Sequence, residues 1–224
     1  MTDNKAIILT DGKDNDKLLL TGNKNRVYIA CMSLTARDTC PGMGLCGGDC
    51  YAWTLSNQYK SVANKYASNY ELSKLDSFVD MVNSDIANVY YGHKYIRIHV
   101  SGDFYSSDYL AKWVKIANDN PDKIFYAYTK SVPIVKEYKD KYGLPDNLII
   151  TYSYGGKFDD MIDPVNDRHV IVISKDAPAP AGYADGSKDD LAVVKYQKVY
   201  LRYHGRHKWE NSQFRFIKLP DGIY

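Results

Sequence analysis

Residues 95–100 read Tyr-Ile-Arg-Ile-His-Val, a stretch in which polar and apolar side chains alternate. Successive side chains of a β-strand point to opposite faces, so the alternation predicts a strand with one face on a core and the other on a polar, functional space. His99 on the polar face has two interpretations, an acid–base group or a hydrogen-bonded core histidine. The apolar face is expected to carry Ile96, Ile98 and Val100, and the polar face Tyr95, Arg97 and His99.

On both sides of this stretch the chain alternates between strand-like and helix-like segments. Such alternation predicts βαβ units and a parallel sheet. The predicted strands are residues 26–34, 95–100, 124–129, 148–152 and 170–173. The predicted helices are two within residues 51–89 that break near Ser68 or Asn69, one over 108–118 that Ser106 and Ser107 cap, and one over 134–142 that Gly143 ends.

These elements predict a single domain, residues 1–224, of the α/β class. About five or six mostly parallel strands are too few for a full eight-stranded (β/α) barrel, so residues 25–175 are expected to form a partial (β/α) barrel. A flavodoxin-like open sheet is the alternative. Residues 176–190 are rich in Pro, Ala, Gly and Asp and predict a long loop, and the segments 192–203 and 213–219 predict a C-terminal β-hairpin.

Composition indicates a globular protein and gives little indication of a charged partner. Hydrophobic residues make up 45% of the 224 residues and charged residues 25%, which excludes a disordered or fibrous chain. The net charge of +2 does not indicate nucleic-acid or membrane binding through bulk charge. Residues 1–16 are polar and no stretch approaches the ~18 apolar residues of a membrane span, so a cytoplasmic protein without a membrane partner is expected.

Four cysteines, all in the first quarter of the chain, predict a local site. In a reducing cytosol, clustered cysteines bind metal or perform chemistry more often than they form disulfides. Cys40, Cys46 and Cys50 follow the pattern Cys-x5-Cys-x3-Cys on a loop with four glycines, and Gly lets a backbone fold closely around a metal centre. Three interpretations remain open: a [4Fe–4S] cluster on these three thiolates, a zinc site with Cys31 as fourth ligand, or unligated thiols.

Further motifs accompany the cysteine loop. Tyr51 follows the last cysteine, and Ser101-Gly102-Asp103-Phe104 follows the strand predicted at 95–100. Together these features resemble the radical S-adenosylmethionine (SAM) enzymes. The resemblance implies that Cys40, Cys46 and Cys50 hold a [4Fe–4S] cluster, that SAM chelates its open iron, and that Ser101, Gly102 and Asp103 bind the SAM amino group.

A more specific resemblance covers residues 25–175. Residues 39–53, 101–104 and 125–131 are similar to a phage-encoded family of radical-SAM-like proteins. Both gaps in the cysteine motif are longer than the usual Cys-x3-Cys-x2-Cys, so cluster binding is implied more strongly than SAM cleavage. The expected function is therefore an iron–sulfur protein, with a radical-SAM-type reaction on an unknown substrate; the alternative is a non-enzymatic metal-binding module with a structural or partner-binding role.

Three further positions are candidates for ligand contact. Asp103 follows a strand end, where parallel sheets bind small molecules, and its alternative role is to cap the next helix together with Ser106. Lys130 follows the next strand and is a candidate for binding a cofactor carboxylate or phosphate; otherwise it is a solvated lysine. Residues 204–207 read His-Gly-Arg-His and form the best candidate for nucleic-acid contact.

Overall fold

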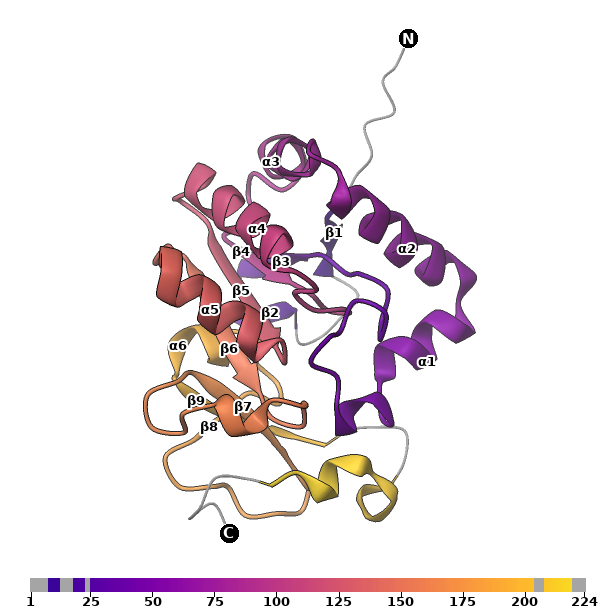
Figure 1. Ribbon diagram of the computed structural model, residues 1–224, viewed down its shortest axis with the longest axis vertical. Coiled ribbons are helices and arrows are strands. Elements are labelled where there is room, and N and C mark those ends of the chain that lie inside the picture. The colour runs from indigo at the N-terminus through magenta and orange to yellow at the C-terminus, as the bar shows by residue number, and fades with distance from the viewer. Residues whose placement is uncertain (1–7, 13–17, 23–24, 204–207, 219–224) are drawn as a thin grey trace.

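The computed structural model describes residues 8–12, 18–22, 25–203 and 208–218, and its centre is a mostly parallel sheet (Figure 1). Six strands lie side by side in chain order, each parallel to the next. This order contradicts the flavodoxin-like alternative, in which the strand order reverses at a switch point. The six strands are β3 (Asn25–Cys31), β4 (Tyr95–Ile98), β5 (Ile124–Thr129), β6 (Leu148–Ser153), β7 (His169–Ile173) and β9 (Lys198–Arg202).

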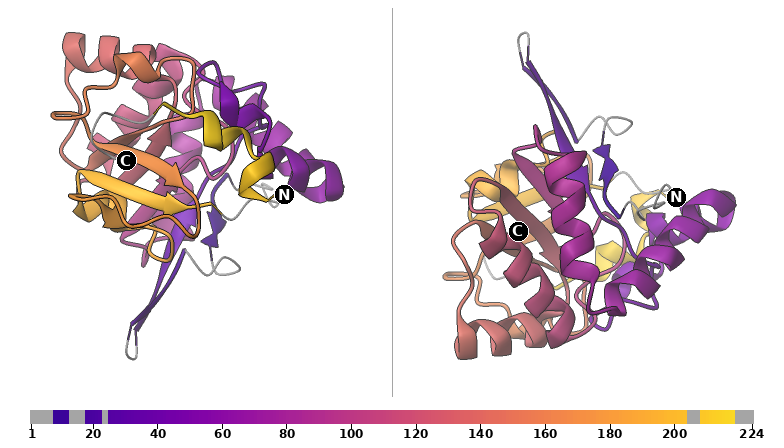
Figure 2. Two further views of the ribbon diagram at one scale, coloured as in Figure 1. Left: turned by 90° about the horizontal axis from the view of Figure 1, so that it is seen from below. Right: turned by 90° about the horizontal axis from the view of Figure 1, so that it is seen from above.

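Short strands extend both edges of this parallel sheet. At one edge β1 (Thr10–Asp11) and β2 (Leu19–Gly22) pair antiparallel with β3, and β2 with the start of β3 extends away from the body (Figure 2). At the other edge β8 (Ala184–Asp185) pairs parallel with β9. Within the described ranges the strands form an open path from β1 to β8, so the α/β class and the mostly parallel sheet are confirmed, whereas barrel closure is not.

Helices cover the sheet unequally. Three of them, α3 to α5, lie over one face, and the short α6 lies on the other (Figure 1). In α4 the apolar residues fall on one stripe, which buries Tyr109, Leu110 and Trp113 against the sheet. The helices are α1 (Tyr51–Gln58), α2 (Lys60–Lys74), α3 (Phe78–Asn88), α4 (Ser107–Asp119), α5 (Val132–Tyr142) and α6 (Ala192–Lys195).

The alternation of side chains along each strand produces two cores. On β5, Phe125 and Ala127 belong to the larger core under the helices, whereas Tyr126 belongs to a smaller core on the other face. The smaller core includes Ala192 and Val193 of α6. We call the face of the sheet that carries Tyr126 the inner face.

His99 departs from the predicted alternation. Its φ is 66°, in the left-handed region that non-glycine residues rarely adopt. The turn reverses the side chain, so the His99 ring lies 4.7 Å from Phe104 and its Nε2 lies 3.0 Å from the hydroxyl of Tyr109 in α4. The prediction that His99 shares a face with Tyr95 and Arg97 is therefore wrong, and the core-histidine interpretation is confirmed.

Two other predictions of local structure are corrected. The segment 51–89 contains three helices, separated at Tyr59 and at residues 75–77, and helix α2 runs unbroken through Ser68 and Asn69. The C-terminal hairpin is wrong for the described residues: α6 and β9 occupy 192–202, with β9 parallel to β7, and residues 213–216 form a 3-10 helix. No described helix is long and apolar enough to cross a membrane.

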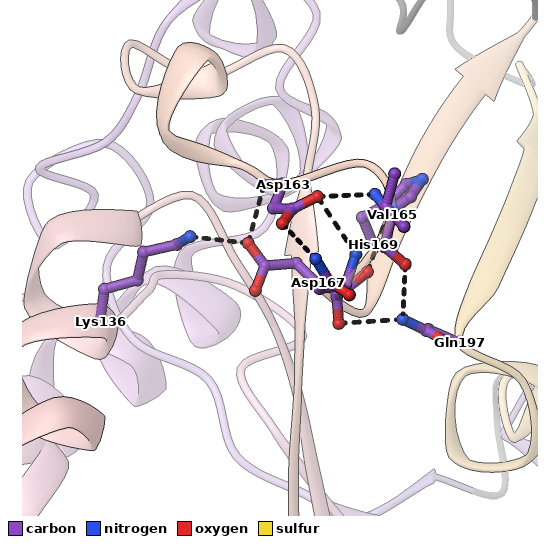
Figure 3. A network of polar contacts seen from close by, with 7 residues as sticks. Lys136, Asp163, Val165, Asp167, His169 and Gln197 are labelled. Atoms are coloured by element: carbon purple, nitrogen blue, oxygen red, sulfur yellow. Dashed lines mark hydrogen bonds and ion pairs between the residues drawn. The ribbon is translucent and has the colours of Figure 1, made fainter.

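A polar network fixes the connection between β6 and β7 (Figure 3). The carboxylate of Asp163 accepts hydrogen bonds from the backbone N–H groups of Val165 and Asn166, and Asp167 accepts one from the N–H of Asp163. Lys136 of α5 forms a 2.7 Å ion pair with Asp167. The network thus ties a turn-rich loop to helix α5, and all of these groups bond to protein atoms.

Candidate functional site

The cysteine loop, residues 32–50, crosses the carboxyl end of the sheet, the usual place for ligands in such folds. Leu34 N donates to Ser101 O at 2.8 Å, and Ser101 Oγ donates to Leu34 O at 2.8 Å. Gly102 has a φ of +85°, and a Cβ there would lie 2.6 Å from both Leu34 Cβ and Thr39 Oγ1. Ser101 and Gly102 therefore hold the cysteine loop against the end of β4.

Glycines let the same loop pack directly on the ends of β5 and β6. A Cβ at Gly42 would lie 1.9 Å from the carbonyl oxygen of Lys130, and one at Gly44 would lie 2.7 Å from the carbonyl carbon of Gly156. The backbone N–H of Lys157 donates to Gly42 O at 3.0 Å. No larger residue fits at these positions, so these glycines are explained by backbone packing whether or not a metal centre is present.

All four cysteines are free, and those of the loop are half-buried. Burial raises the pKa of Cys40 to about 12, and the charges of Asp103, Cys46 and Cys50 act in the same direction, which indicates that these groups lie near one another. The Sγ of Cys50 accepts a hydrogen bond from Trp53 N at 3.5 Å at the start of α1. Three thiols thus lie at one end of the sheet.

Cys31 has a different environment. It is 6% exposed, belongs to the smaller core, and its Sγ lies 3.3 Å from Thr10 Oγ1. Burial raises the pKa of its thiol. These contacts agree with the interpretation of Cys31 as a small buried apolar residue.

The thiols of the loop are not gathered around a single point. In the described part of the chain, no group of three or more His, Cys, Asp or Glu side chains is close enough together to hold one metal ion. A [4Fe–4S] cluster binds its cysteines through different iron atoms, so its sulfur ligands stand farther apart than those around one zinc ion. A single zinc ion would therefore require these ligands to move closer together on binding.

Lys130 lies beneath the cysteine loop with its ammonium group fully hydrogen-bonded. Its Nζ donates to Ser153 O at 2.9 Å, to Ser153 Oγ at 2.7 Å and to Tyr154 O at 2.7 Å. Burial lowers the pKa of Lys130, and the charges of Cys46 and Asp159 oppose that shift. Lys130 is thus a partly buried cation near the loop thiols, and the alternative of a freely solvated lysine is wrong.

Asp103 connects two strand ends and is only 5% exposed. Its Oδ1 accepts from Phe104 N at 2.7 Å and from Thr129 Oγ1 at 2.6 Å, and its Oδ2 accepts from Lys130 N at 2.8 Å. Burial raises the pKa of this carboxyl. Ser106 Oγ caps helix α4 through Tyr109 N without Asp103, so the helix-cap role of Asp103 is wrong.

On the inner face, a buried ion pair forms at Arg97, the next-to-last residue of β4. Both carboxylate oxygens of Asp190 lie 3.1 Å from Arg97 Nη1, and the hydroxyls of Tyr126 and Tyr128 donate to the same carboxylate at 2.7 and 3.2 Å. The Nε of Arg97 is buried without a hydrogen-bond partner among the described residues. This network joins β4 and β5 to the segment that precedes α6. The sequence predicted the polar strand face that carries Arg97, but not the ion pair with Asp190.

The C-terminal segment also contacts the cysteine loop, which the sequence did not predict. Asp49 accepts hydrogen bonds from Ser212 Oγ at 2.8 Å and from Gln213 N at 2.7 Å. A Cβ at Gly155 would lie 2.9 Å from Ile217 Cδ1. Residues 212–217 therefore lie beside the loop (Figure 1), whereas the predicted nucleic-acid turn at 204–207 lies outside the described residues.

The family model for gene product 88 matches residues 8–216, nearly the whole chain. The chain belongs to the gene product 88 family. It is 29% identical over 157 residues to the gene 88 protein of Mycobacterium phage L5, which covers 66% of this chain and 65% of that protein. It is 31% identical over 102 residues to the gene 88 protein of Mycobacterium phage D29, which covers 41% of this chain and 42% of that protein.

The matched stretch therefore spans less than two thirds of either phage relative. No solved structure matches the chain. The predicted relationship to a phage-encoded family is confirmed at this level. The radical-SAM-like character of the gene product 88 family, the cluster and the cofactor roles of Ser101, Gly102, Asp103 and Lys130 stay predictions.

Proposed function

We propose that the chain is an iron–sulfur protein that binds a [4Fe–4S] cluster through Cys40, Cys46 and Cys50. The observation that carries the proposal is the position of these free thiols, on one glycine-rich loop at the carboxyl end of a parallel sheet. That end of the sheet is where such folds bind cofactors. The environment of Cys31, buried in the smaller core, supports a three-cysteine site.

The charge distribution around the loop also fits a cluster. Three thiolates bring negative charge into a half-buried place, and such charge is unfavourable there unless it is compensated. The fixed ammonium of Lys130 interacts with the charges of Cys46 and Cys40 and supplies part of that compensation. Gly42 and Gly44, on both sides of Met43, let the backbone of the loop pack closely on the strand ends, and this packing positions the cysteines.

A cluster held by three cysteines would provide one-electron transfer and one iron with an exchangeable ligand. The polar groups predicted to hold SAM fit that cofactor poorly. Ser101 Oγ, three acceptor positions of Asp103 and all three protons of Lys130 already bond to protein atoms. SAM binding is therefore a separate question from cluster binding, and we derive no reaction step through it.

The test is spectroscopic and uses the full chain purified without oxygen. Broad thiolate-to-iron absorption in the visible region is expected, and the electron paramagnetic resonance spectrum of the reduced protein should change when SAM is added if the fourth iron is open. If the electron paramagnetic resonance spectrum of the cluster does not change when SAM is added, the function of the cluster would be limited to electron transfer or to a structural role. A colourless protein with one zinc per chain would support the non-enzymatic metal-binding module instead.

A further inference from the structure

Three large aromatic side chains are exposed within nine residues at the start of the helical flank. Tyr51 is 54% exposed, Trp53 36% and Tyr59 49%. Burial of a ring of this size normally stabilises a protein, so several exposed rings in one short helical segment indicate an interaction site. We call Tyr51, Trp53 and Tyr59, with the residues of α1 between them, the aromatic surface.

Two of the three rings, Tyr51 and Trp53, are held in place by contacts with other segments. The hydroxyl of Tyr51 donates to Val100 O at the end of β4, and the guanidinium of Arg37 lies 4.4 Å from the centre of the Trp53 ring. Arg37 is itself fixed by a 2.7 Å hydrogen bond from Nη2 to Gly47 O. Rings that are fixed before binding lose little conformational entropy when a flat ligand stacks on them.

Polar groups that suit base edges lie beside the Trp53 ring. Trp53, Thr54, Asn57 and Gln58 line an open, shallow hollow on the surface of α1. The amides of Asn57 and Gln58 each offer a donor and an acceptor, and both residues are exposed. The hollow thus combines an aromatic wall with hydrogen-bonding groups.

The charge of the aromatic surface favours a polyanion. The sequence from Tyr51 to Tyr70 contains no Asp or Glu, and it includes the exposed Lys60 next to Tyr59. Arg37 adds a second positive charge at Trp53. Asp49, the acid that immediately precedes this stretch, is engaged by Ser212 and Gln213.

We propose that the aromatic surface binds single-stranded nucleic acid, with unpaired bases stacked on Trp53 and Tyr59 and phosphates near Lys60 and Arg37. Base–aromatic stacking accepts every base and needs bases whose faces are free, which excludes duplex. The surface continues directly into the cysteine loop, since Cys50 Sγ accepts from the N–H of Trp53. Binding by these rings goes beyond the proposed function and needs no cluster.

The experiment is fluorescence anisotropy with a labelled 15-nucleotide oligothymidylate, the same strand in an oligodeoxyadenylate duplex, and a 15-nucleotide oligouridylate. We expect binding of both single strands and clearly weaker binding of the duplex. Trp53→Ala and Tyr59→Ala should each weaken single-strand binding about 5- to 100-fold, the effect of one stacked base. Lys60→Ala should reduce the slope of log affinity against log salt by about 0.7.

Matched controls separate stacking from general surface effects. Tyr91 and Tyr142 are 74% and 63% exposed. Tyr91 follows α3 and Tyr142 is the last residue of α5, so both lie at the amino end of the strands, opposite the cysteine loop. Tyr91→Ala and Tyr142→Ala should leave binding unchanged. Cys46→Ser should also bind normally, which distinguishes this inference from the iron–sulfur proposal. No binding by the parent protein, tighter binding of the duplex, or equal losses in all four aromatic variants would overturn the inference.

Discussion

At the scale of single residues, His99 combines a buried imidazole with a backbone conformation that non-glycine residues rarely adopt. It is 3% exposed, its backbone is left-handed, and its Nδ1 has no hydrogen-bond partner among the described residues. Burial, with the charge of Arg97, lowers the pKa of His99 to about 3. The ring is therefore neutral in the folded protein at neutral pH. In acid the unfolded state takes up a proton at His99 more readily than the folded state, which lowers the stability of the fold.

This pKa predicts how stability depends on pH. The unfolded-state pKa of histidine is ~6.5, so stability contributed by neutral His99 is complete above that value and is lost as the pH falls toward 3. Between pH 7 and pH 5 the loss from this one group is about 2 kcal/mol. His99→Gln should remove about that much from the difference in unfolding free energy between the two pH values, measured by urea titration. An unchanged difference would show that folding does not lower the pKa of His99.

Asp103 allows a second prediction at this scale. In Asp103→Asn one carboxylate oxygen becomes an NH2 group, which cannot accept the hydrogen bonds from the backbone N–H groups of Phe104 or Lys130. A buried donor left without its acceptor costs about 1–3 kcal/mol. The urea midpoint should fall accordingly without any cofactor, whereas Asp76→Asn at an exposed position should have almost no effect. Equal stability of both variants would refute this connecting role.

At the scale of elements, the packing of the cysteine loop on the strand ends depends on Gly102. Gly102→Ala combines an unfavourable φ with overlap against Leu34 and Thr39, whereas Gly143→Ala has the φ problem alone and Gly92→Ala has neither. The conformation of Gly143, with φ 75° and ψ 174°, is one that essentially only glycine adopts, and it costs another residue about 1–3 kcal/mol. We expect a loss of unfolding free energy near that value for Gly143→Ala, a larger loss for Gly102→Ala and almost none for Gly92→Ala. Equal losses of unfolding free energy in Gly102→Ala and Gly143→Ala would mean that the cysteine loop can shift to make room for the added methyl group without a measurable cost.

The Arg97–Asp190 pair connects β4 to the segment before α6, and it gives a prediction for the inner face. The side chain of Asp190 is 1% exposed and that of Arg97 13%, so removing one partner leaves a buried charge. Asp190→Ala should lower the unfolding free energy by about 3–5 kcal/mol. The double variant Arg97→Met, Asp190→Leu should recover part of that loss, because no isolated charge remains, although the hydroxyls of Tyr126 and Tyr128 still lose their acceptor. A double variant as unstable as the single one would contradict this account.

At the scale of the whole molecule, local sequence patterns predicted the central parallel strands of the sheet, but they did not predict the strands at its edges. The segment 124–129 was predicted as a strand with the same bounds as β5, because its apolar run and flanking turns are local features. The C-terminal hairpin was wrong because residues 213–216 are set by tertiary contacts with Asp49 and Gly155. Neighbours that distant in sequence leave no periodicity in the segment itself.

The sequence predicted where the site residues lie better than it predicted what each of them does. Cys40, Cys46, Cys50, Asp103 and Lys130 were expected at one end of the sheet, and their mutual electrostatic interactions agree with that placement. Asp190 could not be found, because it joins Arg97 from 93 residues away. The reversal of His99 was also hidden, because an alternating pattern carries no sign of a single left-handed residue.

The most direct measurement of the central claim is the iron and acid-labile sulfide content of anaerobically reconstituted protein. The account predicts about four irons and four sulfides per chain, as a [4Fe–4S] cluster requires. Cys31→Ser should retain that content, because Cys31 lies in the smaller core, whereas Cys40→Ser, Cys46→Ser and Cys50→Ser should each lose it. Iron and sulfide that persist in all three loop variants, or a parent protein that takes up one zinc and no iron, would contradict the account.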